Sequence, residues 1–450
     1  MSDNPNAPTV PGASTSPAQQ ALAADTLAEN TATGTLRTPV RPKYIVFLLL
    51  AMFGAYVALV APIGISLALR VQELVPQNVE VLGYIIGIAA IVTTITGPLM
   101  GIWSDRTRSR FGRRRQFGLG GAVVGFIGLA VVASATGVPL LLVGWVITSF
   151  GWSTTMNSLI QSQADRLPES QYGRVAGMTG FVQMVAPVFG VGLASAFIGN
   201  NFLVFLVPGA VGLLSLVAWF IFIPERDTRG IEFADSMTAA KVLGSMVFKP
   251  SSYPDFAWNW LARLLFMTGV TFSTTFTSLF FASRLSEGGQ VADIGGIIVI
   301  LSLVSLAVTG VGALLGGILS DKLGRRKIFV LGSGIVYTAG AITLAFGGSN
   351  FGVLLIGSAL TGLALGVFSS VDQALVLNVL PEKDTDAGRF LGINGYSTSI
   401  AQGFAPLVAA PLILIGASGD QKNYGLLFIV ASVLTITAGI IVQWKVKSVR

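Results

Sequence analysis

Two charged residues, Arg263 and Asp372, lie inside long stretches of mostly apolar residues. Removing an ionised side chain from water is costly unless it is paired, so such a residue usually faces a partner or a cavity. The chain has no histidine, so any proton handled near neutral pH must be carried by a carboxylate. We expect Asp372 to pair with Arg263 when it is ionised and to bind a proton when the two separate. A fixed structural ion pair is the alternative.

The segments that hold these residues are predicted to be membrane-spanning helices. Of the 450 residues, 52% are hydrophobic and 11% are charged, whereas about a quarter of an ordinary soluble chain is charged. The apolar residues form blocks of the length that crosses a bilayer, and the 54 glycines allow membrane helices to approach closely. The predicted spans are Tyr44–Leu69, Leu82–Trp103, Phe117–Ala135, Val138–Ile160, Val175–Ile198, Phe202–Ile223, Phe256–Phe281, Ile294–Leu319, Ile328–Phe346, Phe351–Leu380, Phe390–Ile415 and Tyr424–Val442.

The basic residues indicate how these spans are oriented. Nearly all of the 28 Lys and Arg residues fall on the side that carries the N-terminus, while Arg70, Arg284 and Lys422 fall on the other. Positive loops stay in the cytoplasm, so both termini are predicted to be cytoplasmic. The net charge of +7 is then an orientation signal and needs no nucleic-acid partner. At 1.5 Å per residue, Arg263 and Asp372 both lie roughly 10–12 Å from the cytoplasmic side.

The chain contains an internal repeat with an offset of six spans. The segment GIWSDRTRSRFGRRRQF follows the second span, and GGILSDKLGRRKIF follows the eighth. Leu-Pro-Glu and then Gly-Arg join spans four and five and again ten and eleven, and Gln-x-x-Ala-Pro recurs in spans five and eleven. An even offset gives both halves the same membrane orientation, so the halves are predicted to be parallel repeats about an axis normal to the membrane.

These two loops resemble the signature of the major facilitator superfamily, and the resemblance covers residues 44 to 445. The first loop, S-D-R-x-x-S-R-F-G-R-R-R, is similar to that of the sucrose carriers and the glycoside–cation symporters. The resemblance implies a central cavity lined by helices 1, 4, 7 and 10, and a sugar or glycoside that moves with a coupling cation. Spans two and four lack the acidic residues that members of this branch carry there.

The acids of the signature loops sit where helices end, so they can accept hydrogen bonds from a neighbouring helix's free N–H groups. We expect the loop charges to form a conformational latch that opens when the halves rock. For the arginines, the alternative is that they fix topology only. The expected latch residues are Asp105, Arg113, Arg114, Arg174, Asp321, Arg325, Arg326 and Arg389.

Polar and aromatic residues on the predicted spans are candidates for binding substrate, because sugars bind through hydrogen bonds and stacking on aromatic faces. The alternative for each amide is a hydrogen bond that holds two helices together. The candidates are Trp152, Asn157, Gln161, Asn259, Trp260, Gln373, Asn394 and Gln402.

We therefore expect a secondary transporter, not an enzyme, that takes up a sugar or glycoside with a proton; sodium is an alternative coupling ion. Proton-driven export of hydrophobic compounds, and a channel or transport-dead receptor on the same scaffold, are the competing functions.

Without cysteine, no disulfide or thiolate metal site is possible, and we expect no cofactor and no metal. The chain is expected to be a monomer among the lipids of the plasma (inner) membrane. The predicted organisation is a disordered tail over 1–43, six-helix bundles over 44–223 and 256–450, and a cytoplasmic linker over 224–255.

Overall fold

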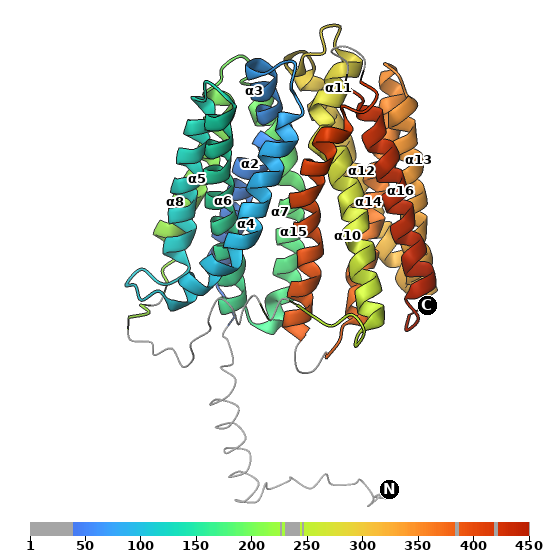
Figure 1. Cartoon of the computed structure of the whole chain (residues 1–450). Helices are drawn as coiled ribbons and strands as arrows, with labels where there is room; N and C mark the ends of the chain where they lie inside the picture. The colour runs from blue at the N-terminus through green and yellow to red at the C-terminus, as the bar shows by residue number, and fades with distance from the viewer. Residues whose placement is uncertain are drawn as a thin grey trace, which may run out of the picture.

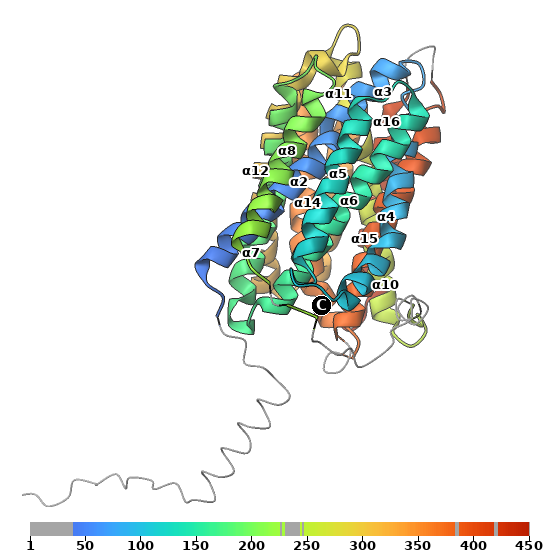
Figure 2. The ribbon, with the colours of Figure 1, turned by 90° about the vertical axis from the view of Figure 1, so that its left-hand side faces the viewer.

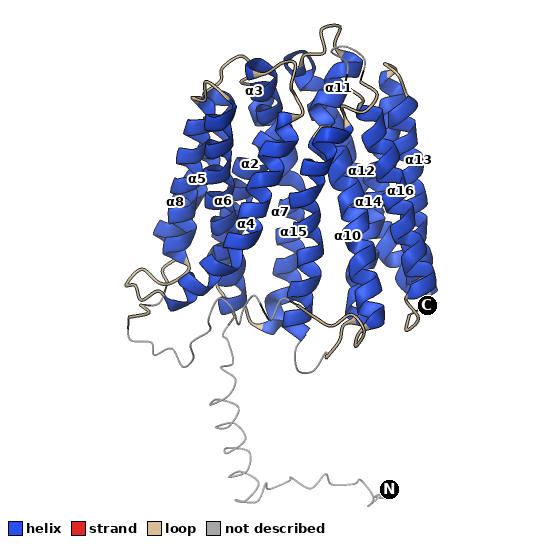
Figure 3. Cartoon of the chain, viewed as in Figure 1, coloured by secondary structure: helices blue, strands red, loops and turns tan. Residues whose placement is uncertain are grey.

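The computed structural model describes residues 39–225, 227–229, 244, 247–382, 387–417 and 422–449. Most of the predicted tail (1–43) and much of the predicted linker (224–255) lie outside these residues. The described chain is helical and contains no strand (Figure 3). The helices stand side by side along one direction, as a protein that spans a membrane requires (Figure 1).

The N-terminal half contains six long helical segments, each matching one predicted span. The first is α2, which continues through a π-helical turn, η1, into α3. The bounds are α2 Pro42–Ala61, η1 Pro62–Ser66, α3 Leu67–Leu74, α4 Val81–Arg106, α5 Arg115–Ala133, α6 Val138–Arg166, α7 Glu169–Ser195 and α8 Leu203–Phe222.

The C-terminal half repeats this arrangement. Its first span is the pair α10 and α11, which bends by 46° at Phe276. The bounds are α10 Pro254–Thr275, α11 Thr277–Leu285, η2 Val291–Ile294, α12 Gly295–Leu323, α13 Arg326–Phe346, α14 Phe351–Val379, α15 Ala387–Leu412 and α16 Tyr424–Lys445.

The predicted all-helical membrane fold is confirmed. Among the described residues, ten helices are long and apolar enough to cross a membrane, and the bent pair of α10 and α11 makes eleven. The remaining predicted span is α15, whose 26 residues give a helix about 39 Å long but include several polar side chains. Helix α6 runs to Arg166, past the predicted end at Ile160, because a helix needs no apolar residues once it leaves the bilayer.

The helices of each half pack mainly against one another, and the two halves meet along two lines (Figures 1 and 2). Helix α4 packs against α15, and α7 packs against α12. These contacts are equivalent under the offset of six spans, as expected for parallel repeats. We call the end at which α2 begins and α16 ends the terminal end, and the other the α3–α11 end (Figure 1).

Glycines set the spacing between helices inside a half. A Cβ atom on Gly151 of α6 would lie 2.2 Å from the backbone nitrogen of Gly125 on α5. Only glycine fits at such a crossing. The same contact surrounds Trp152, whose indole would lie 2.7 Å from a Cβ on Gly125.

Candidate functional site

The two charges that the sequence places inside apolar helices form an ion pair. Arg263 of α10 donates through Nη1 to the carboxylate of Asp372 on α14. Its Nε donates to Thr398 Oγ1 of α15, at 3.2 Å. The Asp372 side chain is 2% exposed and that of Arg263 is 17% exposed. The pair therefore joins three helices of the C-terminal half, with the carboxylate buried and the guanidinium partly accessible.

Two buried amides lie one helical turn closer to the terminal end than this pair. Asn259 is fully buried beside Asp372, whose carboxylate is the neighbour that its amide N–H faces, and its amide oxygen has no hydrogen-bond partner in the protein. Asn394 is 4% exposed, and its Oδ1 has no partner either. A buried polar atom without a partner costs about 1–3 kcal/mol, so these amides are suited to hydrogen-bond a ligand.

Trp260 fixes this region against α15, since its indole Nε1 donates to the carbonyl of Ile393 at 2.9 Å. The structure thus brings Asn259, Trp260 and Asn394 together with the ion pair on α10, α14 and α15. Gln373 and Gln402 have exposed side chains, and no contact places them in this cluster.

The candidates on α6 lie in the other half of the molecule. Trp152 is fully buried between α5 and α8, where its ring would lie 2.5 Å from a Cβ on Gly212. Asn157 lies against Gly97 of α4. Gln161 accepts a hydrogen bond from Arg114 at 2.6 Å. Trp152 is thus a packing residue in this conformation, and Gln161 belongs to a charge cluster.

A cavity of about 390 Å³ lies near the Arg263–Asp372 pair, on the side of the α3–α11 end. Side chains from α7 in one half and from α10, α12 and α14 in the other line it, and none of the predicted substrate residues is among them. The residues that sequence reasoning missed are hydroxyls such as Ser302, Ser305 and Thr309. Their three- and four-residue spacing along one apolar helix was the available signal.

A stacked aromatic pair separates the cavity from the ion pair. Phe266 on α10 and Phe368 on α14 are fully buried, and their rings lie parallel within 3°, with centroids 3.6 Å apart. Each ring lies about one helical turn from the charged residue on its own helix, on the side of the α3–α11 end. Phe266 also packs edge-on against Tyr337, at 5.7 Å, and Tyr337 lines the cavity.

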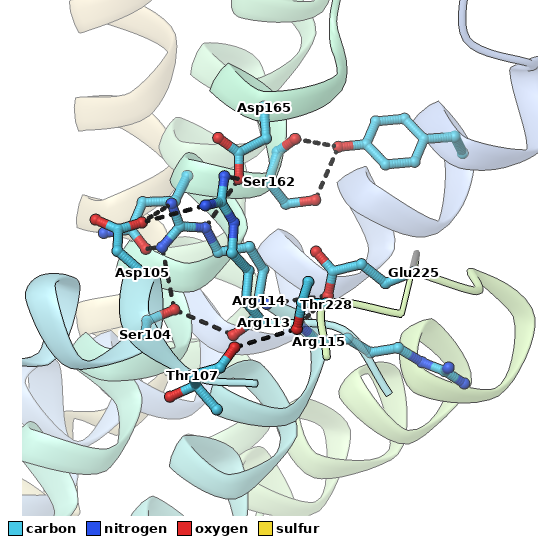
Figure 4. A network of polar contacts seen from close by, with 12 residues as sticks. Ser104, Asp105, Thr107, Arg113, Arg114, Arg115, Ser162, Asp165, Glu225 and Thr228 are labelled. Carbon is cyan, nitrogen blue, oxygen red and sulfur yellow. Dashed lines mark hydrogen bonds and ion pairs between the residues drawn. The ribbon is translucent and has the colours of Figure 1, made fainter. Parts of the chain in front are cut away.

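The first signature loop forms a charge cluster around Arg114, whose side chain is 6% exposed (Figure 4). Arg114 donates to Asp105, and to Asp165 at 2.9 Å. Arg113 donates to Asp165 at 3.0 Å. Glu225 accepts from the backbone nitrogens of Arg114 and Arg115, at 2.9 and 2.8 Å, which satisfies free donors at the start of α5.

The second loop forms a smaller version of the same arrangement. Arg326 donates to Asp321 at 3.0 Å and to the carbonyl of Ala374 at 2.7 Å. Arg325 and Arg174 have exposed side chains. Arg389 donates to the carbonyl of Val247 at 2.9 Å. In this conformation the described partners of the Asp105, Arg113 and Arg114 side chains all lie in the N-terminal half, so this cluster braces one bundle and does not tie the bundles together.

The two halves are tied together at the α3–α11 end. The Gln72 amide donates to the carbonyl of Gly289 at 2.7 Å and accepts from the backbone nitrogen of Val291 at 3.0 Å. Glu80 and Lys422 form an ion pair at 3.1 Å, with side chains only 13% and 12% exposed. The sequence places Lys422 on this side but gives no sign of its partner.

Helix packing at this end is equally close, whereas α7 and α15 have uncovered glycines near the terminal end. A Cβ on Gly83 of α4 would lie 2.6 Å from the carbonyl of Pro406 on α15. Near the terminal end, a Cβ on Gly177 or Gly180 of α7, or on Gly392 of α15, would have no atom within 4 Å. The structure is therefore closed between the halves at the α3–α11 end and looser toward the terminal end.

A family model matches most of the chain. A model described as Major Facilitator Superfamily matches residues 44–310 and 291–449. "Multidrug resistance protein 2" of Bacillus subtilis (strain 168) is 23% identical over 395 residues, which is 86% of this chain and 93% of that protein. "Minor myo-inositol transporter IolF" of the same organism is 38% identical over 74 residues, a match that spans 16% of each chain.

Solved transporters share the fold. The nucleoside transporter NupG superimposes with a TM-score of 0.70 at 13% identity, covering 90% of this chain and 99% of that one. A bacterial homologue of the human lysosomal transporter Spinster, in an inward-facing and occupied conformation, gives a TM-score of 0.67 at 14% identity, over 90% and 96% of the two chains. At these identities the likeness concerns the fold alone.

Reversing one charge of the Glu80–Lys422 pair is expected to open the α3–α11 end. Since the chain has no cysteine, a single Ala410→Cys, buried against Gly83, reports on that opening. Losing a buried pair costs about 3 kcal/mol, so Glu80→Lys should raise the thiol's reaction rate with a maleimide at least about tenfold. The double reversal Glu80→Lys with Lys422→Glu should restore the slow rate. Equal rates in all three proteins would show that the pair does not hold this end closed.

Proposed function

This chain belongs to the Major Facilitator Superfamily, a family of membrane transporters, and we propose that it is a secondary transporter that takes up a small uncharged solute, a sugar or glycoside, together with a proton. The observation that carries this proposal is the buried Arg263–Asp372 pair. The two charges are held on different helices, so any motion that separates α10 from α14 changes the proton affinity of the carboxylate.

The surroundings of the pair support a substrate with hydroxyl groups. The amide oxygens of Asn259 and Asn394 are buried without a hydrogen-bond partner, and each amide also carries N–H donors, so a polyol can bind to them through several hydrogen bonds. Protonation of Asp372 would release Arg263 to bind the solute or Asn259. Return of the proton to the cytoplasm would re-form the ion pair and favour release. Asp372 is thus proposed as the coupling residue, and Asn259, Trp260 and Asn394 as the substrate contacts.

Export of hydrophobic compounds is the second candidate, because the lining of the 390 Å³ cavity contains neither a charged residue nor an amide. A relative over most of the chain is named as a multidrug resistance protein. Transport by purified protein in proteoliposomes distinguishes the two functions. Labelled disaccharides should accumulate under an inward proton gradient if the protein takes up sugars, and should not accumulate if it exports hydrophobic compounds. A sodium gradient imposed in parallel identifies the coupling ion.

The coupling proposal predicts that Asp372→Asn abolishes accumulation but not exchange. The asparagine keeps the shape of the side chain and can no longer give up a proton. Gradient-driven uptake should fall to the level of empty liposomes, while exchange without a gradient should continue. Ser369→Ala, on the exposed face of the same helix, is the control and should behave as the parent does. Undiminished accumulation by Asp372→Asn would refute the coupling role, and loss of folding would favour a structural pair.

The latch proposal predicts different effects for the two acids around Arg114. Asp105 is 51% exposed, so Asp105→Asn should change stability by no more than about 1 kcal/mol while slowing transport. Asp165 is 30% exposed and binds two arginines, so Asp165→Asn should lower the free energy of unfolding by about 2–3 kcal/mol. Thermal unfolding and initial transport rates check both. Transport at the parental rate by Asp105→Asn would leave the loop with a topological role only.

We propose that the protein lies in the plasma (inner) membrane of the cell that makes it. Its terminal end is proposed to face the cytoplasm. Cysteines introduced singly at Ser14 and Ser236 should then be protected from impermeant thiol reagents in intact cells, because both lie in segments on the positively charged side. Glu287→Cys, on the exposed loop after α11, should react. Labelling of Ser14→Cys and Ser236→Cys from outside would reverse the topology.

A further inference from the structure

A groove of about 400 Å³ lies between α12 and α13, within the C-terminal half, and none of its lining residues lines the 390 Å³ cavity. Helix α14 forms its floor, since α12 and α13 both pack closely on α14 and touch each other little. The lining is apolar except for one hydroxyl, on Ser333, which donates to the carbonyl of Val330 at 2.7 Å. We call this space the α12–α13 groove; Leu315, Leu319, Ile328, Phe329, Val336 and Val367 are among its lining residues.

The α12–α13 groove opens on the outer surface of the bundle, at the depth of one leaflet. Leu315, Leu319 and Ile328 on its rim are each about half exposed. Ile328 lies just after the start of α13 at the terminal end, and Val336 follows eight residues later, which is about 12 Å along the helix. Because the hydrocarbon core of a bilayer is about 30 Å thick, the groove spans most of the leaflet on the terminal side.

The internal repeat shows what fills the equivalent space in the N-terminal half. When the two signature loops are aligned on Ser-Asp and on Gly-Arg-Arg, Trp103 of α4 corresponds to Leu319, and Phe117 of α5 corresponds to Phe329. The Trp103 ring packs edge-on against Phe117, with centroids 5.5 Å apart. The space that Phe117 lines among α4, α5 and α6 is only about 10 Å³. Leu319 has no ring to lay on Phe329, so the C-terminal half leaves unfilled a groove whose walls lack packing partners.

The loop that joins α12 to α13 places positive charge at the terminal end of the groove. Residues 321–327 contain four basic residues and one acid, a net charge of +3. The acid, Asp321, is bound by Arg326 at 3.0 Å, while Lys322 and Arg325 have exposed side chains. Basic residues at the membrane surface attract anionic lipid headgroups. A phosphate held by Lys322 and Arg325 would lie where an acyl chain can enter the groove.

We propose that the α12–α13 groove binds one acyl chain of an anionic phospholipid from the leaflet at the terminal end, with the headgroup phosphate held by Lys322 and Arg325. The bilayer thereby supplies the packing that Trp103 supplies in the other half. The bound chain joins α12 and α13 above α14 and stabilises the C-terminal half. The site goes beyond the proposed function and does not depend on which solute or ion is transported.

Native mass spectrometry of the purified full chain tests the headgroup. With dioleoyl phosphatidylglycerol and dioleoyl phosphatidylcholine at equal concentrations, the chain should retain phosphatidylglycerol in preference. Each basic residue contributes about fivefold to binding an anionic headgroup, so Lys322→Gln with Arg325→Gln should weaken phosphatidylglycerol binding at least about tenfold. Arg108→Gln with Arg110→Gln removes the same charge from the first loop and should bind as the parent does. Equal retention of the two lipids, or equal loss in both double variants, would overturn the proposal.

Two variants of α12 test the acyl-chain site. Leu319→Trp copies the arrangement of the N-terminal half and fills the groove while every charge stays in place. Each buried methylene contributes about fourfold to affinity, so this variant should bind phosphatidylglycerol at least about tenfold more weakly. Leu314 is exposed and does not line the groove, so Leu314→Trp adds the same ring elsewhere and should bind as the parent does. Glycerol 3-phosphate, which has no chains, should not displace the lipid. Parental binding by Leu319→Trp, or displacement by glycerol 3-phosphate, would overturn the groove assignment.

Thermal unfolding in nanodiscs measures the stabilising effect. Replacing phosphatidylcholine by phosphatidylglycerol should raise the unfolding temperature of the parent and of Leu314→Trp, because a ligand that binds only the folded state stabilises it. Leu319→Trp should unfold cooperatively and show no such rise. An equal rise in all three proteins, or none in the parent, would overturn the proposal. The measurement needs no gradient and no transported solute, so its failure would leave the proposed uptake function untouched.

Discussion

The cost of placing ionised groups in an apolar medium governs the arrangement of this protein. A lone charge in the interior of a membrane helix is expensive, and removing one member of a buried pair costs about 3–5 kcal/mol. Arg263 and Asp372 answer this constraint by drawing α10, α14 and α15 together. At the membrane surface, Arg114 does the same for α4, α5 and α6 through Asp105 and Asp165. Each half is thereby a stiff unit.

Stiff halves concentrate any rearrangement at the surfaces between them. Those surfaces are secured at the α3–α11 end by few polar contacts, among them the Gln72 amide and the Glu80–Lys422 pair, together with glycine-mediated packing of α4 on α15. These polar groups can form hydrogen bonds to water when the halves separate, and the hydrophobic core of each half stays buried. Glycines at the other end of α7 and α15 leave flat helix surfaces that are ready to pack.

The sequence predicted the fold well because the spans and the repeat are encoded in composition and periodicity. It also placed Arg263 and Asp372 at one depth, because apolar helices have a fixed rise per residue. It could not show that Trp152 packs between glycines within one half, since rotation of a helix about its axis is set by tertiary contacts. The Glu80–Lys422 pair was equally hidden, as it joins loops far apart in the chain, and the cavity depends on hydroxyls that serve packing in most helices.

The stacked rings of Phe266 and Phe368 have a further consequence, for insulation. With both rings fully buried and 3.6 Å apart, no water molecule fits between them, so the direct path from the cavity to the Asp372 carboxylate is filled by hydrocarbon. Under the proposed coupling role of Asp372, this barrier would keep its proton from reaching the cavity by the direct path. A proton gradient would then not leak along that path in this conformation, whatever occupies the cavity.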